Sequence, residues 1–313
     1  MKIVFMGTPD YAEKTLEAVI AAGHEVIAVF CQPDKPVGRK QVLTPPPVKV
    51  CAEKHGIAVY QPKSLKNEDS QDLIRELNPD IIVVVAYGKL LPKEVLCIPK
   101  YGCVNGHASL LPKYRGASPI QWCIVCGETV TGVSTMLMDE GMDTGDILET
   151  VEVSIGENET GEELFDRLSG ISAKLMVSTI EKLKNGEITP KKQDHANATY
   201  APIIKKEMAF LNFCDKSAKE IFNAVRGYYS WPCAYFFLDG KRIKVIKAEV
   251  GEKTDKAAGT VVSADDYIEI ACKDNVTVRL LEIGPEGSKP MSAKQYLCGK
   301  KIEIGTTVGD VNA

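Results

Sequence analysis

The sequence lacks most of the patterns that identify common enzyme and membrane classes. No apolar run in its 313 residues approaches the ~18 residues that span a membrane. The first residues, MKIVFMGTPD, lack the long apolar core and small-residue cleavage site of a signal peptide, so we read them as a first strand. The G-x-G-x-x-G fingerprint, the phosphate-binding loop and the G-x-S-x-G nucleophile elbow are also missing. These absences argue against a dehydrogenase, a P-loop NTPase and a serine hydrolase.

Cysteine and charge limit the possibilities further. Ten cysteines in a long chain without an export signal favour reduced thiols and a cytoplasmic location. Cys123 and Cys126 form a C-x-x-C, but they lie inside an expected helix over 117–126, so we expect buried structural thiols and no metal. The net charge of −4 argues against a simple nucleic-acid-coating protein. Residues 205–313, with 17 Lys+Arg and 15 Asp+Glu, are mildly basic, which weakly favours a polyanion at the C-terminal part.

Hydrophobic periodicity indicates two domains. Near-continuous apolar runs alternate with amphipathic stretches in the first half, which predicts a doubly wound parallel, Rossmann-like α/β sheet. We expect its strands at 2–6, 25–31, 80–87, 102–107, 130–139 and 146–155, with a long helix at 160–186. After a polar stretch and a helix at 217–227, short strands with turns predict a small, OB-like β-barrel. The expected division is a catalytic domain at 1–188, a linker at 189–207 and the barrel at 208–313.

A group of polar residues lies at the expected end of the strand over 102–107. Asn105 and His107 are two residues apart on a strand, so they face one side, and Ser109 is a possible third member. The acidic partner that we expect is Asp143, in the glycine-rich stretch MDEGMDTGD; spacing alone leaves its three acidic neighbours open, Asp139, Glu140 and Asp146. Asn and His donors can stabilise a tetrahedral oxyanion and an Asp can orient the His, so this set predicts acyl transfer.

Residues 32–50, QPDKPVGRKQVLTPPPVKV, form a long stretch that is rich in proline, glycine and basic residues. A loop of this length between compact elements is usually functional or mobile. Its basic residues could bind a phosphate-bearing substrate, and the alternative is a merely solvated loop.

These residues resemble the folate-dependent formyltransferases. The superfamily signature N-x-H-x-S-L-L-P-x-x-x-G matches Asn105 to Gly116, and its D-x-G matches Asp143 to Gly145. FMGTPDYA, PDKPVGR, AVRGYYSWPCAYFFLDGKRIKV and GPEGSKPMSAKQYL extend the likeness, over the whole length, to the branch that acts on methionyl-tRNA. One departure is the loop GRKQVL, which is shorter and less basic than the Gly-Arg-Gly-Lys-Lys run usual in that branch.

The resemblance implies the substrates and their binding residues. The donor would be 10-formyltetrahydrofolate and the acceptor the methionine amine of initiator methionyl-tRNA, with Asn105, His107 and Asp143 catalytic and no metal required. Folate would lie along Val85, Tyr87, Gly88, Ser109, Leu110, Leu111 and Pro112. The tRNA would contact Arg39, as the family's loop arginine, and we add the basic residues Lys35, Lys40, Lys205, Lys206, Arg242 and Lys244.

Two other readings of the sequence stay open. A formyltransferase for a nucleotide amino sugar would account for the catalytic signature but not for the Arg39 loop or the barrel. An RNA-binding protein without catalysis would account for the barrel but not for the Asn-His-Asp set. In the favoured reading we expect a monomer that does not bind membranes.

Overall fold

The structure is a computed structural model that describes residues 1–38 and 40–309. The chain forms two compact units, each made of segments that are not contiguous in sequence. Unit 1 comprises Met1–Pro119, Val130–Ser154 and Phe165–Ala201, and unit 2 comprises Ile120–Thr129, Ile155–Leu164 and Pro202–Ala313. No helix in the described part of the chain is both long and apolar enough to cross a membrane. The domain boundaries expected near 188 and 207 stay a prediction.

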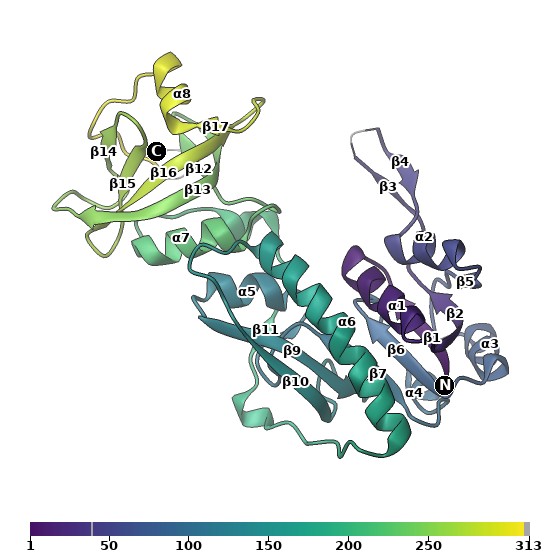
Figure 1. The fold of residues 1–313 in the computed structure, drawn as a ribbon. Helices are drawn as coiled ribbons and strands as arrows, with labels where there is room; N and C mark the ends of the chain where they lie inside the picture. The colour runs from purple at the N-terminus through teal and green to yellow at the C-terminus, as the bar shows by residue number, and fades with distance from the viewer. Residues whose placement is uncertain (39, 310–313) are drawn as a thin grey trace. The chain divides into compact units, whose positions relative to one another are not determined.

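Unit 1 is built on a 7-stranded sheet with the order β10-β9-β7-β6-β1-β2-β5. Five strands are parallel: β1 (Lys2–Gly7), β2 (Glu25–Phe30), β5 (Val59–Tyr60), β6 (Ile81–Val85) and β7 (Cys103–His107). Two antiparallel strands complete one edge: β9 (Val130–Leu137) and β10 (Ile147–Ser154). All five residues of β6 are buried, as expected for a strand covered on both faces. The doubly wound fold class predicted from the sequence is confirmed (Figure 1).

Helices cover this sheet and connect its strands. They are α1 (Asp10–Ala21), α2 (Pro47–Lys54), α3 (Glu68–Leu77), α4 (Lys93–Leu96) and most of α6 (Gly161–Asn185). Ile74 of α3 and Val95 of α4 belong to one buried cluster with Val4 and Met6 of β1. The Tyr11 ring of α1 packs edge-on against Phe165 of α6, with ring centroids 5.2 Å apart. Because the five strands β1, β2, β5, β6 and β7 are parallel, their carboxyl ends all lie at the same end of the sheet. The loops that follow β6 and β7 begin there.

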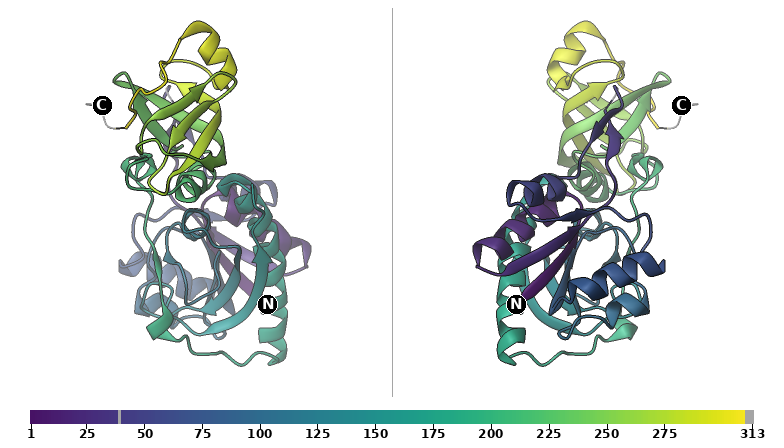
Figure 2. Two further views of the ribbon diagram at one scale, coloured as in Figure 1. Left: turned by 90° about the vertical axis from the view of Figure 1, so that its left-hand side faces the viewer. Right: turned by 90° about the vertical axis from the view of Figure 1, so that its right-hand side faces the viewer.

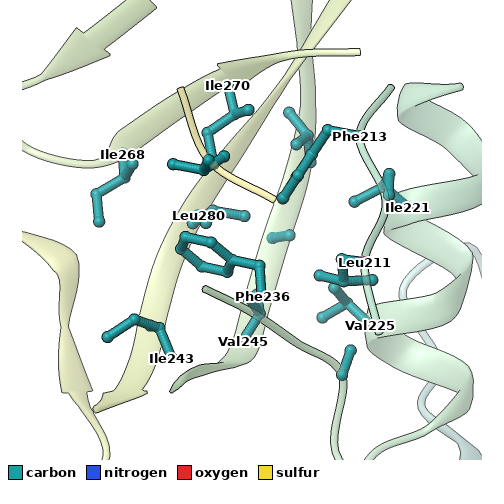
Figure 3. Close-up of a cluster of buried hydrophobic side chains, with 14 of the residues drawn as sticks. Leu211, Phe213, Ile221, Val225, Phe236, Ile243, Val245, Ile268, Ile270 and Leu280 are labelled. Carbon is teal, nitrogen blue, oxygen red and sulfur yellow. The ribbon is translucent and has the colours of Figure 1, made fainter. Parts of the chain in front are cut away.

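Unit 2 has an antiparallel sheet around its own core. Its strands are β12 (Tyr235–Leu238), β13 (Lys241–Lys253), β14 (Val261–Ala264), β15 (Ile268–Ala271), β16 (Val276–Pro285) and β17 (Met291–Ser292). Its helices include α5 (Pro119–Val125), α7 (Ala218–Gly227) and α8 (Ala293–Gly299). Figure 3 shows side chains of the sheet, such as Phe236 and Leu280, packed with Ile221 and Val225 of α7. The sheet curls into a half-barrel, which confirms the predicted small antiparallel β domain.

Three segments differ from their expectations. The long loop contains a hairpin, β3 (Lys35–Val37) with β4 (Val42–Thr44), that projects from the body of unit 1 in Figure 2. The polar stretch read as a linker contains β11 (Tyr200–Ala201), which pairs with β8 (Arg115–Gly116), and short 3₁₀ turns at His195–Asn197 and Lys206–Ala209. Short bridging strands such as these carry too few apolar residues to give a periodic signal. Of the C-x-x-C pair, Cys123 is buried as expected, but Cys126 lies beyond the end of α5 and is exposed.

Candidate active site

Asn105 and His107 lie at the carboxyl end of β7, where the sheet brings them to one face. Between them, Gly106 faces α6: a Cβ added there would lie 3.2 Å from Ser172 Oγ and 3.3 Å from Met176 Cε. Because side chains alternate along a strand, Asn105 and His107 both point to the opposite face. Both are nearly buried, with 9% and 6% of their surface exposed. The prediction that these two side chains share one face is confirmed.

Asp143 reaches both residues from the loop after β9. Its Oδ1 accepts a hydrogen bond from Asn105 Nδ2 at 3.4 Å, and its Oδ2 lies 3.8 Å from His107 Nδ1. The left-handed backbone of Asp143, with φ of 55°, turns its side chain toward the sheet. Sequence spacing could not decide between Asp143 and its three acidic neighbours. Asp143 is the one that the structure places in contact with Asn105 and close to His107.

The acidic neighbours of Asp143 have other partners. Asp139 accepts hydrogen bonds from Gly141 N–H and Thr144 Oγ1 within the loop. Glu140 is exposed and lies 3.6 Å from Lys93, and Asp146 lies 4.0 Å from Lys192. These contacts shape or surround the loop without joining the Asn105 group.

The tautomer of His107 follows from the contact that its ring nitrogen Nε2 makes with a backbone carbonyl. Nε2 lies 2.9 Å from the carbonyl oxygen of Tyr114, and a carbonyl can only accept a hydrogen bond. Nε2 therefore carries a proton, and Nδ1 is the nitrogen that faces Asp143. The ring thus presents Nδ1 to the Asp143 carboxylate at 3.8 Å.

Close backbone packing holds the Asp143 loop. Gly116 N–H donates to Asp143 Oδ2 at 2.7 Å, and Gly116 has a φ of 114°, where a Cβ would lie 2.8 Å from Ala201 O. At Gly145 an added Cβ would lie only 1.8 Å from Leu137 O. Gly116 and Gly145, the glycines of the two sequence motifs, thus let the backbone pack against Ala201 and Leu137 at distances that any side chain would prevent.

Sequence reasoning missed a second layer of buried polar residues behind this loop. Gln193 donates from Nε2 to the carbonyl oxygens of Asp143, at 2.9 Å, and Gly145, at 2.7 Å. Its Oε1 accepts two hydrogen bonds from the buried Arg115, which also contacts His195 Nδ1 at 3.1 Å. Arg115 is marked by its place in the motif before Gly116, but Gln193 lies in the polar stretch read as a linker, where nothing in the sequence distinguishes it.

The predicted folate residues lie on two adjacent loops. Val84 of β6 pairs with Asn105 of β7, so the loops that follow these strands leave the sheet side by side. Val85 and Tyr87 are buried, and burial raises the pKa of the Tyr87 hydroxyl far above its usual range. The Tyr87 carbonyl accepts hydrogen bonds from Thr8 Oγ1 and Gln32 Nε2. Gly88 is exposed, with a φ of 78°.

The turn from Ser109 to Pro112 is fixed by hydrogen bonds. Ser109 Oγ donates to Lys113 O at 2.6 Å, so its hydroxyl hydrogen is directed within the turn, and its place beside Asn105 and His107 stays a prediction. Ser134 Oγ donates to Ser109 O and accepts from Leu111 N–H, at 2.7 and 3.1 Å. Leu111 is buried, Leu110 and Pro112 are half-buried, and the Leu111–Pro112 peptide is cis.

The basic residues assigned to tRNA are distributed over both units. Lys35 and Lys40 are exposed on the hairpin of unit 1, and Arg39 lies outside the described residues. In unit 2, Lys205, Lys206 and Lys244 are exposed, while Arg242 is half-buried with its guanidinium 3.7 Å from the Tyr235 ring centroid. None of the six described residues in this set has a contact that identifies its partner as nucleic acid.

Comparisons with known proteins agree with this architecture. The family described as "Formyl transferase" matches residues 1–180, and "Formyl transferase, C-terminal domain" matches residues 203–301. A methionyl-tRNA formyltransferase of Citrifermentans bemidjiense is 48% identical, covering 100% of this chain and 98% of the relative. That of Thermodesulfovibrio yellowstonii is 46% identical, covering 97% of each chain.

Solved structures show the same fold at lower identity. An N-formyltransferase from Helicobacter canadensis, in complex with folinic acid and dTDP-3-aminofucose, is 20% identical with a TM-score of 0.68, covering 90% of this chain and 98% of that one. A methionyl-tRNA formyltransferase from Clostridium thermocellum is 22% identical with a TM-score of 0.54, covering 80% and 93%.

Proposed function

The chain belongs to the formyl transferase family, and on that premise we propose that Asn105, His107 and Asp143 are its catalytic residues. The enzyme transfers a formyl group to methionyl-tRNA, the reaction for which relatives of 43% to 48% identity over nearly the whole chain are named. The observation that carries the assignment of residues is the convergence of these three side chains at the end of β7.

The proposed donor is 10-formyltetrahydrofolate. Two solved proteins that share the fold, the N-formyltransferase from Helicobacter canadensis and HypX from Aquifex aeolicus, are described in complex with folinic acid and with tetrahydrofolic acid, both folate derivatives. In this chain Val85 at the end of β6, Tyr87 and Gly88 of the loop that follows, and the turn from Ser109 to Pro112 would hold the folate. Their position beside Asn105 supports this role, because a donor bound there would present its formyl group to the catalytic residues.

The proposed chemistry begins with attack of the methionine α-amine on the formyl carbon. A C–N bond forms and the carbonyl oxygen becomes an oxyanion, to which Asn105 can donate a hydrogen bond. One N–H of the Asn105 amide points to Asp143, which leaves the other for the oxyanion. A preorganised donor of this kind contributes about 10²–10³ in rate.

His107 and Asp143 move the proton. The attacking nitrogen gives up a proton to His107 Nδ1, directly or through a water, and Asp143 stabilises the imidazolium that results. The bond between the formyl carbon and folate N10 then breaks, and N10 receives the proton. The products are N-formylmethionyl-tRNA and tetrahydrofolate, so the reaction needs no oxidant and no further reactant.

We also propose that initiator tRNA is held by the basic residues of the hairpin and of unit 2. Because the net charge of the chain is −4, a positive surface must be local. A cytoplasmic location and a monomeric state complete the proposal; N-formylmethionyl-tRNA would be consumed there in translation initiation.

One assay separates this function from its alternatives. The purified chain is supplied with 10-formyltetrahydrofolate that is labelled in its formyl group, and with one of three acceptors: initiator methionyl-tRNA, elongator methionyl-tRNA or a nucleotide amino sugar. We expect label in initiator methionyl-tRNA and none in the same tRNA with its α-amine acetylated. Labelling of the sugar in preference to the tRNA would refute the proposal, and no labelling at all would favour a binding protein.

A further inference from the structure

A group of potential metal ligands lies on the first two helices of unit 1, away from the catalytic residues. Glu17 is on the exposed side of α1, Cys51 is buried on α2, and His55 caps the C-terminus of α2. Cys51 and His55 are four residues apart, so they lie one turn from each other on the same helix face. The two helices pack together, which brings Glu17 of α1 opposite both residues.

The ligand atoms of the three residues lie close together. Glu17 Oε1 is 3.3 Å from Cys51 Sγ, and Glu17 Oε2 is 3.1 Å from His55 Nε2. Within residues 1–38 and 40–309, this is the one group of His, Cys, Asp and Glu whose ligand atoms all lie within 4.8 Å of one another. Tetrahedral Zn²⁺, with bonds of ~2.0 Å to N or O and ~2.3 Å to S, requires ligand atoms about 3.3–3.5 Å apart.

We propose that Glu17, Cys51 and His55 bind a divalent transition-metal ion, for which Zn²⁺ fits best. A thiolate, an imidazole and a carboxylate together select zinc over Mg²⁺ or Ca²⁺, which prefer sets of oxygen ligands. In the structure, the Cys51 thiol donates to the Glu17 carboxylate. Binding replaces that S–H bond by a sulfur–metal bond, the proton leaves to solvent, and the His55 tautomer with its proton on Nδ1 offers Nε2.

The position of the site implies a structural role. The α2 helix begins at Pro47, three residues after β4 ends at Thr44, so it forms the base from which the hairpin projects (Figure 1). A metal ion between α1 and α2 would fix this base to the sheet. A fourth position is left for water or for Glu13, which lies one turn before Glu17 on α1.

Metal titration of the full-length chain tests the proposal. The protein is stripped with a chelator and kept reduced, and Zn²⁺ is then titrated in competition with a chromophoric zinc chelator. We expect one tightly bound equivalent that an equal concentration of Mg²⁺ does not displace. Co²⁺ in place of zinc should give a thiolate-to-cobalt charge-transfer band.

Two variants and one control test the roles of Cys51 and His55 as ligands. Cys51→Ser and His55→Gln should each weaken zinc binding by more than about tenfold, since loss of even outer-shell partners costs about 10–100-fold. Cys51→Ser should also lose the charge-transfer band. The control Cys97→Ser removes an exposed thiol outside the group and should bind zinc as the unaltered chain does. His55 is partly exposed, so its variant should fold normally. Absence of a stoichiometric zinc ion, or equal binding by Cys51→Ser, would overturn the proposal.

Discussion

Replacement of Asp143 by Asn tests the proposed proton transfer without changing the size of the side chain. In the structure its carboxylate accepts hydrogen bonds from Gly116 N–H at 2.7 Å and Asn105 Nδ2 at 3.4 Å, and faces His107 Nδ1 at 3.8 Å. An Asn amide can accept the Gly116 bond through its oxygen. It carries no charge, however, and in this orientation its NH2 group replaces the oxygen that accepts from Asn105.

The distance of 3.8 Å between Asp143 Oδ2 and His107 Nδ1 sets the expected loss of catalytic rate. Two unit charges ~4 Å apart interact by about 4 kcal/mol at an effective dielectric constant of 20, which is an upper limit for the imidazolium at this partly solvated site. That limit corresponds to about a 10³-fold loss of rate. We therefore expect Asp143→Asn to lower kcat by about 10²–10³, within the range usual for general acid–base catalysis. The KM for tRNA should change little, because the tRNA contacts that we propose lie on other segments.

The assay is steady-state formylation of initiator methionyl-tRNA, with circular dichroism as a check of folding. The matched control is Glu140→Gln in the same loop, whose carboxylate is exposed and makes only a 3.6 Å surface contact with Lys93. A surface pair of this kind contributes at most about 1 kcal/mol, and the control should keep its turnover within about twofold. A folded Asp143→Asn enzyme with turnover within about threefold of the unaltered chain would refute the reasoning.

Three further predictions concern the support of the site and the binding of tRNA. Gln193→Ala leaves buried carbonyls and a buried guanidinium without their partner, so chemical denaturation should show unit 1 destabilised by about 2–3 kcal/mol. Gly145→Ala forces a clash with backbone and should abolish formylation, whereas Gly170→Ala in α6, with open space around its Cα, should stabilise by about 0.5–1 kcal/mol. Lys244→Ala should reduce the slope of log Kd for tRNA against log salt concentration by about one unit. The control Lys174→Ala, at another exposed lysine, should leave this slope unchanged. Equal slopes for Lys244→Ala and the unaltered chain would contradict the assignment of Lys244.

Residues on regular elements could be predicted from the sequence. The apolar runs at 2–6, 25–31 and 80–87 became β1, β2 and β6, and their composition identified them as strands of a parallel sheet; β1 after its first residue and all of β6 are buried. Alternation along β7 then placed Asn105 and His107 together. Asp143 was expected from its glycine-rich stretch and then from its family motif, but the left-handed turn that brings it to His107 leaves no periodic trace in the sequence.

Contacts between distant segments could not be predicted in the same way. Gln193 bonds to carbonyls about 50 residues earlier in the chain, and one polar residue in a polar stretch gives no sign of such a partner. The proposed metal ligands show the same limit. Cys51 and His55 have a helical spacing that the sequence reveals, but Glu17 joins them only because α1 packs on α2, and from the sequence we expected no metal.

The most direct test of the proposed active site is the single-turnover rate of formyl transfer by His107→Ala. Saturating 10-formyltetrahydrofolate and initiator methionyl-tRNA are mixed rapidly with excess enzyme, and tRNA affinity is measured separately. We predict a rate lower by about 10²–10⁴, with the Kd for tRNA within about twofold of that of the unaltered chain. A folded His107→Ala enzyme that transfers the formyl group at a near-normal rate would contradict this prediction.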